Sequence, residues 1–137
     1  MKQIKNILLV DDDEITNFLN SQLIEGKEVA ENVHTVLNGQ EALDYLKKHC
    51  IDRSNGERCP SVIFLDLNMP VMDGFEFLEK FNYLEEIDKN GLPVFILTSS
   101  ENKSDVSKAE RFNVTGYISK PLTTEKVDFA IQKVNEL

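Results

Sequence analysis

Short apolar runs alternate along the chain with longer segments whose apolar residues recur at helical spacing. These runs predict strands over Ile4–Val10, Val33–Leu37, Val62–Leu65, Val94–Leu97 and Tyr117–Ser119. The first run is continuous rather than alternating, which is typical of a buried strand. The helical spacing predicts helices over Glu14–Ile24, Gln40–Lys48, Gly74–Leu84, Ser104–Phe112 and Thr123–Asn135. Strands that alternate with helices through short crossovers predict an α/β protein with a parallel sheet and helices on both faces.

The first predicted helix and the segment His49–Pro60 have features that allow more detailed predictions. The first predicted helix has a set of residues at helical spacing and a glycine that marks its end, namely Ile15, Phe18, Leu19, Gln22, Leu23 and Gly26. His49–Pro60 reads as a loop, and it is longer than the usual two to six residues of an αβ connection. Cys50 and Cys59 flank this loop without forming a C-x-x-C motif, so in a reducing compartment we expect two free thiols.

Length and charge narrow the class of protein. A chain of 137 residues has the usual size of one domain, which we expect to span 1–137. No apolar run approaches the roughly 20 residues of a membrane span, and the first strand begins too early to leave room for a signal peptide. We therefore expect a cytoplasmic protein. The net charge of −9 opposes direct binding to nucleic acid or to anionic membranes.

Polar side chains follow four of the predicted strands. The first strand ends in Asp11-Asp12-Asp13, the third in Asp66, the fourth in Thr98 and the last in Lys120. In an open parallel sheet the carboxyl ends of the strands share one edge, and ligands bind there. Carboxylates, a hydroxyl and an ammonium gathered at that edge predict a site for a hard divalent cation and a phosphoryl group.

Each group has a chemical role in such a site. Asp66 is a candidate nucleophile that would form an aspartyl phosphate. Mg²⁺ held by the acidic cluster would offset the repulsion between this carboxylate and the phosphoryl oxygens. Lys120 and the Thr98 hydroxyl would each contact a phosphoryl oxygen. Taken singly, these residues read as helix caps or solvated charges, but their occurrence at four strand ends favours a common site.

The sequence lacks the residue patterns of other common catalytic and binding sites. His34 lies inside a predicted strand and His49 in the long loop, so neither completes a Ser-His-Asp arrangement, and both read as structural or solvated. Cysteine and histidine do not show the spacing of a zinc site. The glycine patterns of dinucleotide-binding and P-loop proteins are absent from the sequence.

Five separated motifs, in order, resemble those of the receiver domain of bacterial two-component response regulators, including the single-domain chemotaxis regulator. The chain shows an acidic pair after Val10, a phosphoacceptor-like Asp66, a Met-Pro-x-x-Asp-Gly turn, a hydroxyl before a small residue and a Lys-Pro pair: Asp11-Asp12, Asp66, Met69 to Gly74, Thr98-Ser99 and Lys120-Pro121. Tyr117 falls where the family keeps its switch aromatic. The resemblance covers essentially the whole chain. Position 99 is Ser where many members have Ala.

The resemblance implies a flavodoxin-like (βα)5 fold with strand order 2-1-3-4-5. It implies that Asp12 and Asp66 coordinate Mg²⁺ directly, that Asp11 does so directly or through water, and that the Asn68 backbone carbonyl completes the set. It also implies that Thr98 and Tyr117 form the switch and that the Lys120–Pro121 peptide bond is cis. The triple Asp leaves open which two form the acidic pair, although the register against Val10 favours Asp11 and Asp12.

By the same resemblance, a histidine kinase would phosphorylate Asp66 and an unidentified downstream protein would read the result through the last two helices and the last strand. Such a protein catalyses only its own phosphorylation and dephosphorylation. The main alternative is a phosphorelay carrier that passes the group to a histidine phosphotransfer protein. Asp11 and Asp13 also match the D-x-D spacing of haloacid dehalogenase-type phosphatases, but that pattern leaves Asp66 unexplained. Flavin binding is disfavoured because acidic residues occupy the loop that would hold the flavin phosphate.

Overall fold

The computed structural model describes residues 4–51, 58–67, 72–87, 92–98, 107–108, 110–112 and 114–136. Strands and helices alternate along it, in the order β1 (Ile4–Val10), α1 (Glu14–Lys27), β2 (Ala30–Val36), α2 (Gly39–Leu46), η1 (Lys47–Ile51, a π-helical turn), β3 (Val62–Asp66), α3 (Gly74–Asn82), β4 (Val94–Thr98), β5 (Gly116–Ser119) and α5 (Thr124–Glu136). Of the predicted helix 104–112, only residues 107, 108 and 110–112 are described.

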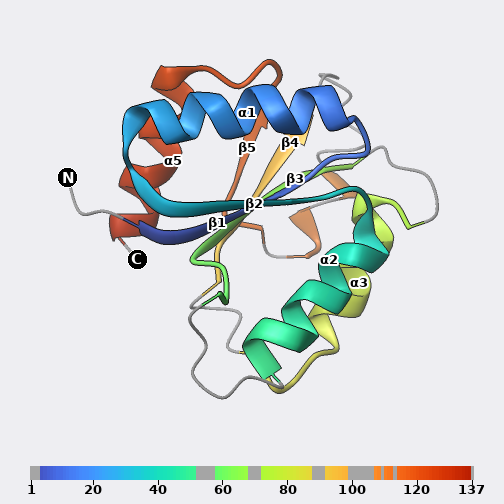
Figure 1. The fold of residues 1–137 in the computed structure, drawn as a ribbon. Coiled ribbons are helices and arrows are strands. Elements are labelled where there is room, and N and C mark those ends of the chain that lie inside the picture. The colour runs from blue at the N-terminus through green and yellow to red at the C-terminus, as the bar shows by residue number, and fades with distance from the viewer. Residues whose placement is uncertain are drawn as a thin grey trace.

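The five strands form one parallel sheet with the order β2-β1-β3-β4-β5. In Figure 1, α1 and α5 lie on one face of this sheet, and α2 and α3 lie on the other. The predicted fold class and strand order are therefore confirmed. Because every strand runs the same way, the carboxyl ends of β1, β3, β4 and β5 meet along one edge.

Two hydrophobic layers hold the helices to the sheet. Side chains alternate along β1, so that Leu8 and Val10 join the layer under α2 and α3, whereas Ile7 and Leu9 join the layer under α1 and α5. The central strand β3 is buried along its whole length, including Asp66 at its end. Each large apolar side chain buried in this way stabilises the fold by about 1.5–3 kcal/mol, which makes the sheet a firm platform for its polar edge.

The second strand begins three residues earlier than its apolar pattern predicts. Ala30 already pairs with Ile4, and the strand continues to Val36. Glu31 and Asn32 are exposed within it. An edge strand has only one neighbour, so hydrogen bonds to β1 can hold residues that bury no apolar side chain.

Among the residues that the structure describes, none of the helices has the length and apolar character of a membrane-spanning helix.

The apolar spacing of α1 does not correspond to its buried face. Ile15, Phe18 and Leu19 are 70%, 61% and 59% exposed, whereas the helix buries Asn17 and Ile24. The helix also continues past Gly26 and ends at Lys27, and Glu28 caps it in the left-handed conformation with φ of 56°. The exposed side chains therefore form an apolar surface on the outside of the molecule.

The expectation of two free thiols is wrong, because Cys50 and Cys59 form a disulfide. The π-helical turn η1 brings Cys50 to the segment before β3, with the two Cα atoms 4.9 Å apart, within the usual range for a disulfide. That segment is also held by side chains, since the Asn6 amide donates to the Cys59 carbonyl and the Tyr45 hydroxyl donates to the Arg58 carbonyl. Spacing along the sequence could not reveal this proximity.

Both histidines lie against Tyr45 near the same corner. The ring centroids of His34 and His49 are 5.5 Å and 4.4 Å from that of Tyr45. Burial lowers the pKa of both imidazoles, and it raises the pKa of the Tyr45 hydroxyl to about 12. The two imidazoles therefore pack around the Tyr45 ring.

Reducing the disulfide should lower the stability of the protein without changing the residues at the carboxyl edge of the sheet. A cross-link between residues nine apart reduces the conformational entropy of the unfolded chain, which raises the free energy of unfolding by about 2.5 kcal/mol. Reduction should therefore lower the melting temperature by about 8 °C. Thermal unfolding followed by circular dichroism, with and without dithiothreitol, measures the difference. A Cys50→Ser/Cys59→Ser variant should melt at one temperature in both buffers. An equal melting temperature for the unaltered chain would contradict the prediction.

Candidate metal and phosphoryl site

Three carboxylates come together at the carboxyl edge of the sheet. One oxygen from each of Asp11, Asp12 and Asp66 lies within 4.8 Å of the other two. Asp11 and Asp66 are buried, at 3% and 5% exposure, whereas Asp12 is exposed. Such closely spaced carboxylates repel one another unless a cation lies between or beside them.

The Asp11 carboxylate is fixed by hydrogen bonds on both oxygens. Its Oδ1 accepts from the Asp13 backbone N–H at 3.0 Å, and its Oδ2 accepts from the Lys120 ammonium at 3.0 Å. The Asp11 backbone N–H donates to the Val36 carbonyl at the end of β2. Both the side chain and the backbone of this residue are therefore held in one position.

Asp13, the third member of the acidic run, caps helix α1. Its carboxylate accepts from the backbone N–H groups of Ile15 and Thr16 and from the Thr16 hydroxyl. The Thr16 hydroxyl and the Ile15 backbone N–H lower the pKa of Asp13. The structure thus separates the run into two parts, with Asp11 and Asp12 in the carboxylate cluster and Asp13 at the helix N-terminus.

Lys120 bridges two of the carboxylates. Its ammonium lies 3.0 Å from Asp11 Oδ2 and 3.5 Å from Asp66 Oδ2. Burial lowers the pKa of this lysine, but the hydrogen bond to Asp11 and the charges of Asp66 and Asp11 outweigh that effect, so its pKa is raised overall. Lys120 is therefore charged at neutral pH and acts as the counterion of the cluster.

The loop that carries Lys120 is anchored at several points. The Lys120 backbone N–H donates to the Thr98 carbonyl at the end of β4. The Lys126 ammonium donates to the carbonyls of Ser119 and Pro121 and to the Ser119 hydroxyl, which holds the start of α5 against this loop. The Lys120–Pro121 peptide bond is cis, as the resemblance implies.

The end of β3 needs a glycine beside it. A Cβ atom at Gly74 would lie 2.8 Å from the Asp66 carbonyl oxygen and 2.8 Å from the Leu67 Cα atom. The Gly74 backbone N–H also donates to the Leu67 carbonyl at 3.0 Å. Asp73 caps α3 through the Glu76 backbone N–H. The start of α3 is therefore held close to the end of β3 by a backbone contact that a side chain at Gly74 would obstruct.

Of the other predicted site residues, Thr98 lies at the same edge, Tyr117 lies within β5, and the rest fall outside the described residues. Thr98 ends β4 opposite Ser119, and Tyr117 pairs with Ile96 in the middle of β5. Both are half-buried, and burial together with Glu110 raises the pKa of the Tyr117 hydroxyl. Asn68, whose carbonyl is a predicted metal ligand, and Ser99 lie outside the described residues.

These groups suit a hard divalent cation. Mg²⁺ is normally bound by one or two carboxylates with water and phosphate oxygens, and the cluster offers carboxylate oxygens from Asp11, Asp12 and Asp66. The Lys120 ammonium lies 3.5 Å from Asp66 Oδ2, from where it can also attract a phosphoryl oxygen. The donor set is all oxygen, which disfavours zinc relative to magnesium, calcium or manganese.

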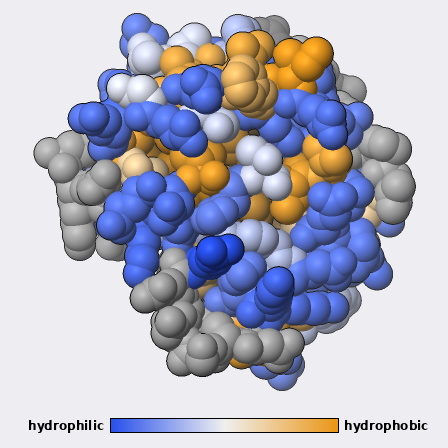
Figure 2. Space-filling model, in the orientation of Figure 1, coloured by the Kyte–Doolittle hydropathy of each residue, from blue (hydrophilic) through white to orange (hydrophobic). Residues whose placement is uncertain are grey.

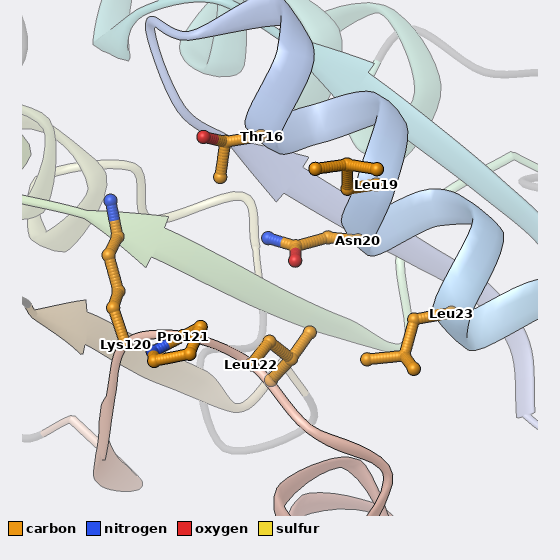
Figure 3. A pocket seen from close by; sticks show the side chains of 7 residues that line it. All are labelled: Thr16, Leu19, Asn20, Leu23, Lys120, Pro121 and Leu122. Carbon is orange, nitrogen blue, oxygen red and sulfur yellow. The ribbon is translucent and has the colours of Figure 1, made fainter.

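A groove of about 580 Å³ opens next to this site. It lies between α1 and the loop after β5, and its lining residues are Thr16, Leu19, Asn20, Leu23, Lys120, Pro121 and Leu122. Figure 3 shows the Lys120 amine at one end of the groove, with Leu23 and Leu122 toward the other. An apolar groove therefore leads directly to the counterion of the carboxylate cluster.

Comparison with known proteins identifies the family. The model of the response regulator receiver domain matches residues 7–132. The chain therefore belongs to the response regulator receiver domain family.

Relatives and solved structures agree with this assignment. A two-component response regulator from Cytophaga hutchinsonii is 34% identical with a TM-score of 0.87, and the match covers 99% of this chain and 100% of that one. The chemotaxis protein CheY of Halobacterium salinarum is 31% identical over 95% of this chain and 96% of its own length. The probable methanogenesis regulatory protein FilR2 of Methanothrix harundinacea is 30% identical over 95% of this chain and 81% of its own. The chain also matches longer proteins, and it spans only 6% of the hybrid signal transduction histidine kinase E of Dictyostelium discoideum.

Two residues at the site were not recognised from the sequence. Asn17 is buried on α1 and hydrogen-bonds the end of β1, and Lys126 holds the β5–α5 loop. Asn17 is one of many polar residues in the predicted helix, and Lys126 resembles any lysine in the first turn of a helix. Asn17 shares one side of the helix with the polar residues Glu14 and Asn20. Its position in the sequence therefore does not distinguish a buried amide from an exposed one.

Proposed function

We propose that this protein is a phosphorylation-dependent signalling switch in the cytoplasm, in which Asp66 accepts a phosphoryl group in a Mg²⁺-dependent reaction. The observation that carries the proposal is the grouping of Asp66 with Asp11, Asp12 and Lys120 at the carboxyl edge of the sheet. The chain makes and breaks only its own aspartyl phosphate, so it is not an enzyme with an external substrate.

In the proposed reaction, an Asp66 carboxylate oxygen attacks the phosphorus atom while the bond to the leaving group of the donor breaks. Mg²⁺ held by Asp11, Asp12, Asp66 and the Asn68 carbonyl would offset the negative charge that gathers on the phosphoryl oxygens. Lys120 stays near Asp66 and attracts one of these oxygens. Thr98, at the end of the next strand, donates its hydroxyl to another. The residues thus position the group and stabilise its charge.

The test of this function is a labelling experiment. Incubation with acetyl phosphate and Mg²⁺ should add one phosphoryl group to the chain, visible by mass spectrometry of the intact protein. Chelation of Mg²⁺ by EDTA should prevent the addition. A chain that stays unlabelled at saturating Mg²⁺ and donor would count against the proposal.

We further propose that the donor protein is a histidine kinase or a histidine phosphotransfer protein that docks on α1. The groove is lined by Lys120, whose ammonium lies 3.5 Å from Asp66 Oδ2, so a partner seated in it would bring a phosphohistidine near Asp66. Leu19 lines this groove, and Ile15 and Phe18 on the same helix are further exposed apolar side chains. Figure 2 shows apolar side chains among hydrophilic ones over the upper part of the molecule, where Figure 1 places α1. Such a surface suits the apolar face of a partner helix.

Replacing Phe18 with Glu should slow phosphorylation by a histidine protein but not by acetyl phosphate. Phe18 is 61% exposed, so its loss costs little stability, while an aromatic residue near the centre of an interface commonly contributes about 2 kcal/mol or more. Transfer from a phosphorylated histidine phosphotransfer protein should therefore be at least about tenfold slower. Rates are measured by the decay of radiolabel on the donor.

Tyr83→Glu is the matched control. Tyr83 is an aromatic residue with 78% exposure, and it follows α3 on the opposite face of the sheet. This variant should receive the phosphoryl group at the rate of the unaltered protein. Equal slowing in both variants would refute docking on α1, and slowing with acetyl phosphate would show that Phe18→Glu damages the site itself.

The output would leave through the surface formed by β5, α5 and the predicted helix 104–112, toward an unidentified protein. Thr98 would move to the phosphoryl group, and Tyr117 would turn inward in response. The half-buried position of Tyr117, in contact with the layer under α2 and α3, supports this proposal. The alternative role as a phosphorelay carrier predicts return of the phosphoryl group from Asp66 to a histidine protein. Neither role involves direct contact with nucleic acid or a membrane.

A further inference from the structure

A buried amide joins three segments beside the carboxylate cluster. Asn17 is 3% exposed on α1, and its Nδ2 atom donates to the Asp11 carbonyl at 2.9 Å and to the Val36 carbonyl at 3.2 Å. The Val36 carbonyl also accepts from the Asp11 backbone N–H. One side chain thus ties helix α1 to the end of β1 and to the end of β2.

Packing alone does not account for an asparagine at this position. The Asn17 Oδ1 atom is buried and has no hydrogen-bond partner among the described residues. An unpaired buried acceptor lowers stability, and an apolar side chain of the same size would avoid that cost. What an apolar side chain could not supply is the pair of hydrogen bonds from Nδ2 to the two carbonyls.

Those hydrogen bonds fix the backbone that carries two of the three clustered carboxylates. The Asp11 carbonyl leads directly into the peptide bond of Asp12, and Asn17 is the side chain that anchors it. Mg²⁺ requires nearly ideal octahedral geometry, so small displacements of its ligands weaken binding. Groups that orient metal ligands without touching the metal commonly affect affinity as much as 10–100-fold.

We propose that Asn17 is a positioning residue for the metal site: its amide holds the β1–α1 loop so that Asp11 and Asp12 keep the geometry that Mg²⁺ requires. This inference rests on the proposed function. Without the amide, the loop would relax away from β2. The Asp11 and Asp12 carboxylates would then have to be ordered by the metal itself, which reduces its affinity.

The test compares Asn17→Leu and Asn17→Ala with the unaltered protein. Leu keeps the size of the side chain without its donors, and Ala avoids any steric conflict. Isothermal titration calorimetry should show Mg²⁺ affinity roughly tenfold weaker or more in both variants. In labelling with acetyl phosphate, the half-saturating Mg²⁺ concentration should rise by the same factor, while the rate at saturating Mg²⁺ stays close to that of the unaltered protein.

Asn6→Leu is the matched control. Asn6 is also a fully buried asparagine whose amide donates to a backbone carbonyl, that of Cys59, but it lies at the opposite end of β1, roughly 17 Å from Asp11 at ~3.3 Å per residue. Loss of this amide should lower the melting temperature and leave Mg²⁺ affinity unchanged. A loss of Mg²⁺ affinity in Asn6→Leu equal to that in the Asn17 variants would show a general effect of destabilisation and overturn the inference.

Three other results would also decide the matter. Unchanged Mg²⁺ affinity in folded Asn17 variants overturns the inference and leaves the proposed function intact. Unfolding of both Asn17 variants shows that the residue is structural, which likewise overturns it. Failure of the unaltered protein to bind Mg²⁺ overturns the proposed function and the inference together.

Discussion

Asp66→Asn should abolish phosphorylation by acetyl phosphate. Asparagine has nearly the shape of aspartate, so the buried end of β3 stays packed, but the amide is not a nucleophile toward phosphorus. The change also removes the charge that attracts Lys120 across 3.5 Å. Mass spectrometry of the intact protein after incubation with donor and Mg²⁺ should show no added phosphoryl group.

Asp128→Asn provides the control for the loss of a paired carboxylate. Asp128 lies on α5 and forms a 2.9 Å ion pair with Lys27 on α1, away from the cluster. This variant should be labelled like the unaltered protein. Continued labelling of Asp66→Asn would assign the phosphoryl group to another residue, and peptide mapping would show whether Asp11 or Asp12 had accepted it.

Asp12→Ala should weaken Mg²⁺ binding strongly and at the same time stabilise the metal-free protein. Asp12 is exposed, whereas Asp11 is buried against Lys120, so the substitution removes a carboxylate without breaking that ion pair. Loss of a direct ligand should exceed the ~10–100-fold cost of losing an orienting group. Relief of repulsion among three carboxylates within 4.8 Å of one another should raise the melting temperature without metal.

The neighbouring residue supplies an informative control. Asp13→Ala removes the N-cap of α1, which costs about 1 kcal/mol of stability, yet its carboxylate is not part of the cluster. Titration calorimetry should therefore show nearly unaltered Mg²⁺ affinity and a lower melting temperature, the reverse of Asp12→Ala. If Asp13→Ala lost Mg²⁺ affinity and Asp12→Ala retained it, the acidic pair would have been assigned to the wrong residues.

The sequence reveals the sheet edge well because its signals are local. A continuous apolar run identifies a buried strand, and the polar residue that follows marks where the strand leaves the core. Val62–Leu65 followed by Asp66 is the clearest example, and the observed strand differs only by including the aspartate. Since all parallel strands end at the same edge, the grouping of Asp11, Asp12, Asp66 and Lys120 follows from topology alone.

Features that depend on contacts between distant segments could not be predicted in the same way. The spacing of Ile15, Phe18 and Leu19 shows that they share a side of α1 but not whether that side faces the sheet. The Cys50–Cys59 disulfide depends on how η1 approaches the segment before β3. Asn17 gains its importance from the carbonyls of Asp11 and Val36, one of which belongs to a different strand.

The ion pairs of Lys120 also determine how the net charge of the site changes when Asp66 is phosphorylated and dephosphorylated. Three carboxylates share one ammonium, so the metal-free site has a formal surplus of two negative charges, which a divalent cation balances. Conversion of Asp66 to its acyl phosphate adds about one negative charge, because a phosphoryl group of about −2 replaces the carboxylate charge of −1. The charge also changes its location, because it moves outward from the buried strand end. Signalling by this protein would accordingly shift negative charge toward the surface, and ionic strength should affect the encounter with a partner more than the state of the site.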